Sequence, residues 1–290
     1  MFTEVADRVL VARYRQWDVT VGLVLGRDGA LVVDTRASAG QGREVLDDVR
    51  AVAPGTRVTH VVNTHVHFDH TLGNAAFADA RIHAHDNVAR AIAVEAEQAK
   101  ALLRTARPET GDPTADLADR ADGADRADIA DLLATPVRPP DAAFGRSAVI
   151  DLGDREVVLR YAGRGHTDGD IGVFVPDADC AFLGDLVEES AHPSLGADCW
   201  PLEWADTLRR LGAPLGPASV VLPGHGRPVD AGFVERQRHE LRALATVIVE
   251  RRLAGLSLEE ASRTPDARLP YPLPWLADAF ARGWEQLPRG

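Results

Sequence analysis

The hydrophobic pattern of the chain changes twice from short apolar runs to longer amphipathic stretches. In the first hundred residues the apolar runs are short, rich in β-branched residues and bounded by Gly or Asp, which predicts strands. These predicted strands span residues 9–12, 19–25, 30–34 and 58–63. Two stretches with apolar residues on one face predict helices at about 40–53 and 86–104.

The second half of the chain repeats this order. Its apolar runs predict strands at 148–152, 157–161, 171–175, 180–184 and 219–222. Its amphipathic stretches predict helices at about 202–211, 230–254 and 274–287. Because no glycine-rich nucleotide-binding pattern accompanies these elements, we expect two β-sheets packed together, one from each half, with helices outside. The residues that end the strands would then meet at one edge of the sandwich.

A composition change interrupts the pattern between residues 105 and 146. Ala, Asp and Arg dominate residues 105–131, and few large apolar side chains are available there to anchor the segment. We expect an exposed insertion, partly helical or mobile, which is either a lid beside a site or a solvated connection. We treat residues 1–290 as a single domain, with this insertion and a C-terminal helical extension at about 230–290.

Composition and charge limit the partners of this domain. The chain has 290 residues, of which 45% are hydrophobic, so it can bury a sizeable core without disulfides or a structural metal. Its formal net charge of −12 disfavours nucleic acid and anionic membrane surfaces. Acidic residues near the N-terminus do not fit a secretory signal, and no apolar run approaches the roughly 18 residues of a membrane span. We therefore expect a cytoplasmic protein without a nucleic-acid or membrane partner.

Three histidines and an aspartate crowd into residues 65–70 (His-Val-His-Phe-Asp-His), directly after a predicted strand. Alternation along an extended chain places His65 and His67 on the same side. Asp69 and His70 follow the start of a turn and can address a second point nearby. Imidazole and carboxylate are ligands that zinc accepts, and burying such groups without partners would cost several kcal/mol. The cluster therefore indicates a metal site and not a part of the core.

Three later loops each place one more candidate ligand beside glycine and just after a predicted strand. The candidates are His166 in Gly-His-Thr, Asp185 in Gly-Asp and His225 in Pro-Gly-His-Gly. Glycine lets the backbone turn sharply and approach an ion closely. Each loop is a weak signal alone, but together with residues 65–70 the four segments strongly indicate one metal centre.

In this order, the motifs Thr-His-x-His-x-Asp-His, Gly-His-Thr, Gly-Asp and Pro-Gly-His-Gly resemble those of the metallo-β-lactamase superfamily. The resemblance covers roughly residues 12–226 and includes Asp34, which matches the first motif of the family at the end of an early strand. It implies an α+β fold, the four-layer αββα sandwich, with a dinuclear metal site at its edge.

The resemblance also implies two groups of ligands that share one carboxylate. One ion would be held by His65, His67 and His166, the other by Asp69, His70 and His225, and both by Asp185. An aspartate at this shared place resembles the glyoxalase II, lactonase and ribonuclease Z branches, whereas the best-known β-lactamases have a cysteine or a histidine there. Two zinc ions per chain are expected, with iron or manganese as alternatives.

Physical chemistry indicates how such a site would work. Two divalent ions about 3.5–4 Å apart lower the pKa of a bridging water to near neutrality and polarise a carbonyl or phosphoryl oxygen. We expect Asp69 to ligate, to orient the attacking hydroxide and to take a proton during turnover. Candidates for contacts that hold the ligands in place are Asp34, Thr64, Thr167 and Asn74. His192 either faces the substrate or lies in an ordinary surface loop.

The favoured function is hydrolysis of an ester, thioester, lactone or amide carbonyl in a small molecule. A β-lactamase is an alternative, and a phosphodiesterase is the least favoured one because the chain is acidic. The apolar segment 269–275 does not resemble the basic glutathione site of a glyoxalase II, and it would pack against the body of the protein or against a second subunit in a homodimer. A different class of enzyme is a mononuclear iron dioxygenase acting on persulfides, with only His65, His166 and Asp185 as ligands.

Overall fold

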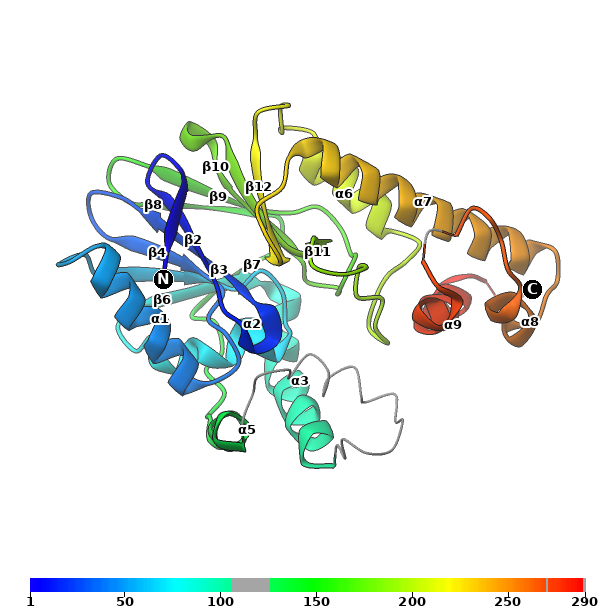
Figure 1. Ribbon diagram of the computed structural model, residues 1–290, viewed down its shortest axis with the longest axis horizontal. Coiled ribbons are helices and arrows are strands. Elements are labelled where there is room, and N and C mark those ends of the chain that lie inside the picture. The colour runs from blue at the N-terminus through cyan, green and yellow to red at the C-terminus, as the bar shows by residue number, and fades with distance from the viewer. Residues whose placement is uncertain (106–125, 270, 289–290) are drawn as a thin grey trace.

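The computed structural model describes residues 1–105, 126–269 and 271–288. It contains two mixed β-sheets that lie face to face between two layers of helices (Figure 1). The first sheet follows the chain order and consists of β1 (Thr3–Ala6), β2 (Val9–Arg13), β3 (Thr20–Leu25), β4 (Ala30–Val33), β5 (Val58–Val62), β6 (Arg81–His85) and β7 (Ala142–Phe144). The second sheet has the order β12 (Val220–His225), β11 (Cys180–Glu188), β10 (Ile171–Val175), β9 (Glu156–Tyr161) and β8 (Ser147–Asp151).

Helices form the two outer layers. The helices that connect the strands β4 to β7 of the first sheet are α1 (Ala39–Val52), α2 (Phe68–Thr71), α3 (Asp86–Thr105) and α5 (Arg126–Ala134). The second sheet is covered by α6 (Trp204–Gly212) and the long α7 (Ala231–Leu253), and α8 (Leu258–Arg263) and α9 (Ala277–Gln286) follow at the end of the chain. Short 3-10 turns are η1 (Gln16–Asp18), η2 (Leu72–Ala76), η3 (Pro176–Ala178) and η4 (Leu273–Leu276).

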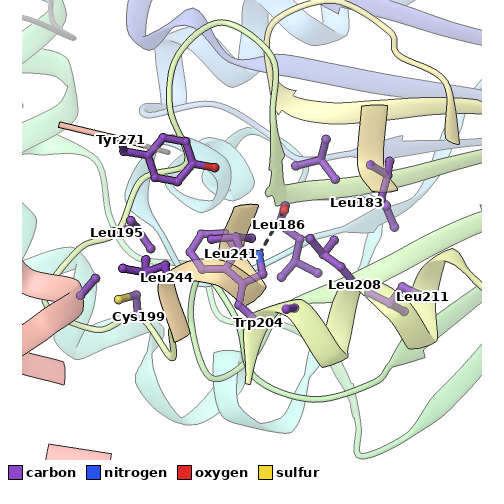
Figure 2. Packing of buried hydrophobic residues seen from close by; sticks show 14 of the residues in the cluster. Leu183, Leu186, Leu195, Cys199, Trp204, Leu208, Leu211, Leu241, Leu244 and Tyr271 are labelled. Atoms are coloured by element: carbon purple, nitrogen blue, oxygen red, sulfur yellow. Dashed lines mark hydrogen bonds between the residues drawn. The ribbon is translucent and has the colours of Figure 1, made fainter. Parts of the chain in front are cut away.

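The apolar core is divided among the three interfaces of this sandwich. Side chains alternate along β4, so Val32 packs toward the helices of the first layer while Leu31 and Val33 pack between the sheets. The third interface joins the second sheet to α6, α7 and α9. Figure 2 shows it around Trp204, whose indole N–H donates a hydrogen bond to the backbone oxygen of Leu186 at 3.1 Å. The predicted αββα sandwich is confirmed.

Three strands escaped the sequence pattern. The first strand, β1, is short and exposed, and β6 carries two histidines in five residues, so neither shows the expected apolar run. The strand β7 consists of small and aromatic residues and pairs with β6. Part of the segment 105–146 is therefore integrated into the fold, because α5 buries Leu132 and β7 extends the first sheet. The rest of that segment, 106–125, lies outside the described residues. The two interpretations of it, a lid or a solvated connection, therefore stay predictions.

Within the described ranges, no helix has both the length and the apolar character needed to cross a bilayer.

Candidate metal centre

The ends of strands from both sheets deliver the candidate ligands to one edge of the sandwich. In the first sheet, β4 and β5 are parallel, so the residues that follow them, Asp34 and the segment 63–67, leave the sheet side by side. In the second sheet, β11 and β12 are parallel and carry Asp185 and His225. His166 comes from the connection between β9 and β10. Ligands far apart in the sequence thus converge because the two sheets pack together.

The seven predicted ligands form two groups in the structure. His65, His67, His166 and Asp185 have ligand atoms within 4.8 Å of one another, and so do Asp69, His70 and His225. We call the group of His65, His67 and His166 the outer position and the group of Asp69, His70 and His225 the inner position.

Asp185 lies between the two positions. Its Oδ2 is 3.4 Å from His166 Nε2 in the outer position and 3.1 Å from His225 Nε2 in the inner position. Its Oδ1 is 3.2 Å from His70 Nε2. One carboxylate therefore faces both groups, which is the geometry expected of a shared ligand.

Each histidine of the outer position has one ring nitrogen engaged away from the centre. His67 Nε2 lies 2.9 Å from Asp198 Oδ2, and His166 Nδ1 lies 3.0 Å from the backbone oxygen of Ser194. These oxygens only accept hydrogen bonds, so the engaged nitrogen carries the proton and the other nitrogen presents a lone pair. His65 Nδ1 lies 3.0 Å from Thr64 Oγ1, whose own proton goes to Asp34. The free nitrogens point into the centre.

The inner position follows the same rule with different partners. His70 Nδ1 donates to Asp34 Oδ2 at 2.9 Å, and His225 Nδ1 lies 3.3 Å from the backbone oxygen of Asp18. The remaining nitrogens, both Nε2, face each other at 3.3 Å. In the outer position, His67 Nδ1 and His166 Nε2 face each other at 2.9 Å.

Lone pairs that face one another need a proton or a cation between them. The buried atoms His65 Nε2 and Asp185 Oδ1 have no hydrogen-bond partner, although burying such groups unpaired is costly. Five imidazole nitrogens and two carboxylates thus form a set of acceptors without donors. Imidazole nitrogens and carboxylate oxygens are also the atoms that bind divalent transition metals, so this set fits an ion such as zinc.

Two glycines permit the close approach of the shared carboxylate. A Cβ on Gly224 would lie 1.8 Å from Asp185 Oδ1, and one on Gly184 would lie 2.7 Å from Thr64 Oγ1. Gly184 also has a φ of 52°, in the left-handed region that favours glycine. The glycines in the Gly-Asp and Pro-Gly-His-Gly motifs therefore have a steric reason in this structure.

Charge and burial shift the pKa values of the site in opposite directions. Burial lowers the pKa of His67, but the charge of Asp198 and the hydrogen bond to it outweigh burial and raise that pKa to about 9. Burial would raise the pKa of Asp198, yet the charge of His67 lowers it to about 2. Burial and the neighbouring His67 lower the pKa of His166 to about 4. For His225, burial is outweighed by the charge of Asp185, which raises the pKa to about 10.

A cavity of about 470 Å³ lies directly on the outer position. His67, Asp69, His166 and Asp185 contribute to its lining. Its other walls are the aromatic pair of Trp17 and Phe68, one face of α3, and the loop from Ser194 to Asp198. The exposed fraction of the His67 side chain is 26%, so this ligand reaches the cavity. A small molecule can therefore meet the metal ligands directly.

Two of the four predicted supporting residues contact ligands, and two do not. Asp34 accepts hydrogen bonds from the backbone N–H and the hydroxyl of Thr64 and from His70, and Thr64 contacts His65. Thr167 donates its N–H and hydroxyl to Asp170 instead, so it shapes the loop beside His166.

Asn74 acts one step further from the ligands. It exchanges hydrogen bonds with Asn63 and accepts one from Thr35, and both of these residues donate to the backbone oxygen of His70. Asn74 therefore supports the backbone that presents His70 and does not touch an imidazole.

His192 is exposed and does not line the 470 Å³ cavity. Its ring lies 5.1 Å from that of Tyr271 and 5.8 Å from that of Trp275. Of the two interpretations of His192, the structure supports the ordinary loop. The sequence did not indicate Asp198, which accepts a hydrogen bond from the candidate ligand His67. A lone aspartate in a loop, 131 residues from its partner, offers no spacing signal.

Residues 14–246 match the family model described as the metallo-beta-lactamase superfamily. The chain belongs to this superfamily. It is a metal-dependent hydrolase of the superfamily, as the order of its motifs predicted.

Two curated relatives have different activities in their names. Over 216 residues the chain is 26% identical to the metallo-beta-lactamase type 2 of Bacillus cereus, which covers 73% of this chain and 69% of that protein. Over 179 residues it is 30% identical to the acyl-coenzyme A thioesterase MBLAC2 of Gallus gallus, which covers 59% of this chain and 58% of that protein. The superfamily membership is thus certain, while the substrate differs among relatives.

A solved structure shares the fold over a longer part of the chain. The inverting sec-alkylsulfatase Pisa1 from Pseudomonas sp. superposes with a TM-score of 0.71 and 15% sequence identity. The likeness covers 98% of this chain and 50% of that protein, so it extends beyond residue 246. At this identity the likeness concerns the fold alone.

Proposed function

We propose that this metallo-beta-lactamase superfamily enzyme binds two zinc ions and hydrolyses an ester, thioester, lactone or amide of a small molecule. The observation that carries the proposal is that the carboxylate of Asp185 lies between two groups of metal-binding side chains, the outer and the inner position. One metal ion would satisfy the outer position and leave the facing nitrogens of His70 and His225 unmatched. The arrangement therefore favours a dinuclear site over the mononuclear iron site of a persulfide dioxygenase.

Two bound zinc ions would supply a water of near-neutral pKa and a polarised carbonyl oxygen. The residues of the chain would orient the reaction around them. Asp69 Oδ2 lies 3.6 Å from both His70 Nε2 and His225 Nε2, and Asp69 also lines the cavity. From this place its carboxylate can hold a water in line with a substrate in the cavity and accept its proton. Trp17 and Phe68 add an apolar aromatic surface to the cavity that these groups line.

The lining of the cavity supports a carbonyl compound over a phosphodiester. Its charged groups among the described residues are carboxylates and ligand histidines, with no lysine or arginine. Apart from the two ions, such a lining offers no basic side chain to pair with the negative charge of a phosphodiester or a β-lactam. The shared ligand is an aspartate, and both cysteines, Cys180 and Cys199, are buried away from the ligand groups.

The partners follow from this proposal. A neutral or positively charged small molecule fits the cavity, and the net charge of −12 argues against nucleic acid. A cytoplasmic location and a homodimer stay predictions of the sequence.

A hydrolysis screen of zinc-loaded protein tests the proposed function. It should include a lactone, a thioester, a β-lactam and a phosphodiester probe, each with and without a chelator, alongside elemental analysis. Turnover of a carbonyl probe that the chelator abolishes, with near two zinc ions per chain, is the expected result. One iron per chain with oxygen consumption, or turnover of the phosphodiester alone, would overturn it.

A further inference from the structure

One face of α3 forms part of the wall of the cavity that the ligand histidines also line. Glu95, Gln98, Ala99 and Leu102 line the cavity, and their spacing of three and four residues places them on the same face of the helix. Ala99 and Leu102 make this part of the wall apolar, and Phe68 is a further apolar side chain in the lining. Glu95 is the one carboxylate in this apolar wall.

Glu95 differs from the other carboxylates of the cavity in its partners. Asp69 and Asp185 face the metal positions, and Asp198 bonds to His67. No hydrogen bond or ion pair engages Glu95 within the described ranges, and its side chain is half-buried. Burial, followed by the charge of Asp198, raises the pKa of Glu95, which indicates that negative charge accumulates on this side of the cavity.

We propose that Glu95 determines specificity by charge: it favours acyl substrates that carry a positive group and disfavours anionic ones. This inference rests on the proposed hydrolysis at the same site. An ammonium group beside Glu95 would complete an ion pair that the protein does not make by itself, while the acyl chain packs on Ala99 and Leu102. An anionic group would instead meet the fields of Glu95 and Asp198 in a partly dry cavity, where repulsion is poorly screened.

The test uses three thioesters with the same butyryl group and different thiols. One thiol carries a trimethylammonium group, one a hydroxyl and one a sulfonate, and thiol release gives kcat and KM. For the unmodified enzyme we expect kcat/KM to fall in that order. In Glu95→Gln the ratio between the cationic and neutral esters should shrink by about two- to fivefold, as for a partly exposed ion pair.

The matched control is Glu97→Gln. Glu97 lies on the same helix, is exposed and does not line the cavity, so this variant changes the net charge equally. An equal effect in both variants, or a preference of the unmodified enzyme for the sulfonate, overturns the proposal. If no ester is hydrolysed, the proposed reaction on thioesters fails separately. Calorimetry then measures the binding of butyltrimethylammonium and butanesulfonate to the unmodified enzyme and to Glu95→Gln. Equal affinity of each compound for these two proteins overturns the proposed charge preference.

A second inference concerns the end of the chain, beyond the residues that match the family model. The loop of residues 193–199 holds two ligands of the outer position: Ser194 accepts a hydrogen bond from His166, and Asp198 bonds to His67. The C-terminal segment 271–288 holds this loop in turn. Trp275 Nε1 donates to the backbone oxygen of Pro193 at 2.8 Å, and Arg282 Nε donates to that of Cys199 at 3.2 Å.

These contacts fix both ends of the 193–199 loop. Gln286 Nε2 also donates to the oxygen of Cys199, at 3.4 Å, and the guanidinium of Arg282 lies 5.1 Å from the centroid of the Trp200 ring. Figure 2 shows Leu195 and Cys199 beside Leu244 of α7, within the same apolar cluster as Tyr271. The loop is thus anchored by apolar packing and by side-chain donors from the end of the chain.

We infer that Trp275 and Arg282 are positioning residues for the outer metal position. Partners that bond directly to a metal ligand usually affect metal affinity by about 10–100-fold. Trp275 acts one step further away, so its loss should weaken binding at the outer position by about three- to tenfold. The Nδ1 atoms of His70 and His225, in the inner position, bond to Asp34 and Asp18 and not to the 193–199 loop. The zinc affinity of the inner position should therefore stay unchanged.

Trp275→Phe keeps the ring packing and removes the indole donor. Zinc affinity is measured at both positions by competition with a chromophoric chelator, and unfolding is measured on chelated protein. The control is Trp284→Phe, because Trp284 packs in the same C-terminal region near Phe280 and makes no bond to the loop. Equal weakening of both ions, unchanged affinity, or the same loss in Trp284→Phe overturns the inference. If Trp275→Phe does not fold, Arg282→Gln replaces it with the same expectation.

Discussion

The outer and inner metal positions share Asp185 and the same kind of imidazole ligand, yet they are held by different parts of the chain. The inner position depends on Asp34 and on the backbone of Asp18, which both belong to the first half of the chain. The outer position depends on Asp198 and Ser194, which belong to a loop of the second half. Both positions take ligands from both halves of the chain, but the residues named here that hold the ligand histidines come from the first half at the inner position and from the second half at the outer one.

The two positions also differ in access. The exposed fraction of the side chain is 26% for His67 in the outer position and 0% for His70 in the inner one. The cavity touches His67 and His166 but, of the inner ligands, only Asp69. The 470 Å³ cavity thus meets two ligands of the outer position and one of the inner position, while His225 of the inner position lines a separate cavity of about 270 Å³. The comparison of the two positions leads to five predictions.

The largest effect is expected where the two positions are joined. Gly224→Ala places a Cβ 1.8 Å from Asp185 Oδ1, so the shared carboxylate must move and both ions should be lost. We expect activity at the level of chelated protein and little zinc by elemental analysis. Gly212→Ala is the matched control, because a Cβ there has no neighbour within 4 Å. Two zinc ions per chain in Gly224→Ala would contradict this account of Asp185.

Asp69→Asn separates metal binding from proton transfer. An amide can still orient a water but cannot accept its proton, so activity should fall by about 10²–10⁴-fold while zinc content is only partly reduced. Steady-state kinetics and elemental analysis on the same preparation measure both quantities. Full activity of the variant would show that Asp69 takes no proton.

Asp34→Asn and Asp198→Asn test whether the two positions are held separately. Each carboxylate accepts a hydrogen bond from a ligand histidine, so its replacement should weaken binding of the dependent ion by about 10–100-fold. Asp198→Asn should affect the outer position alone. Asp34→Asn should affect the inner position most, and the outer one less, because Asp34 also bonds to Thr64 beside His65. Competition titrations of zinc resolve the two affinities, and identical profiles would refute the separation.

The smallest effect is a pH dependence of zinc affinity at the outer position. His67, with a pKa raised to about 9 by Asp198, carries a proton at pH 7 that an ion must displace. Affinity should therefore rise between pH 7 and pH 9, by at most about tenfold per unit. In Asp198→Asn the pKa of His67 returns toward its ordinary value, and the rise above pH 7 should shrink. Chelator competition at several pH values measures the slope, and an unchanged slope in the variant would contradict the role of Asp198.

The same shift has a consequence for stability in the presence of chelator. A histidine whose pKa is raised on folding stabilises the folded state fully below pH 6.5, and this contribution is lost as pH rises through about 9. Thermal unfolding of chelated protein should accordingly show that His67 contributes less to the free energy of unfolding at pH 9 than at pH 6.

Much of the fold could be predicted from the sequence, and so could the seven side chains that the structure brings together in the two groups. Apolar runs such as those of β3 and β10 are periodic over a few residues, and they predict strands without any knowledge of their neighbours. The candidate ligands of residues 65–70 are close in sequence. His166 follows β9, and Asp185 and His225 lie within β11 and β12, each beside glycine. Patterns of this kind are local, so the chain alone specifies them.

Other features were decided by tertiary structure. The strand β7 lacks an apolar run and exists because β6 offers an edge to pair with. Asp198 becomes a partner of His67 only when the second sheet packs on the first, and Glu95 becomes part of the cavity wall only when α3 packs beside α2. These contacts join residues that no motif connects, and their free energy comes from packing between distant segments. The sequence by itself determined the chemistry of the metal centre, and the tertiary structure decided how its two positions are held and what shape of molecule reaches them.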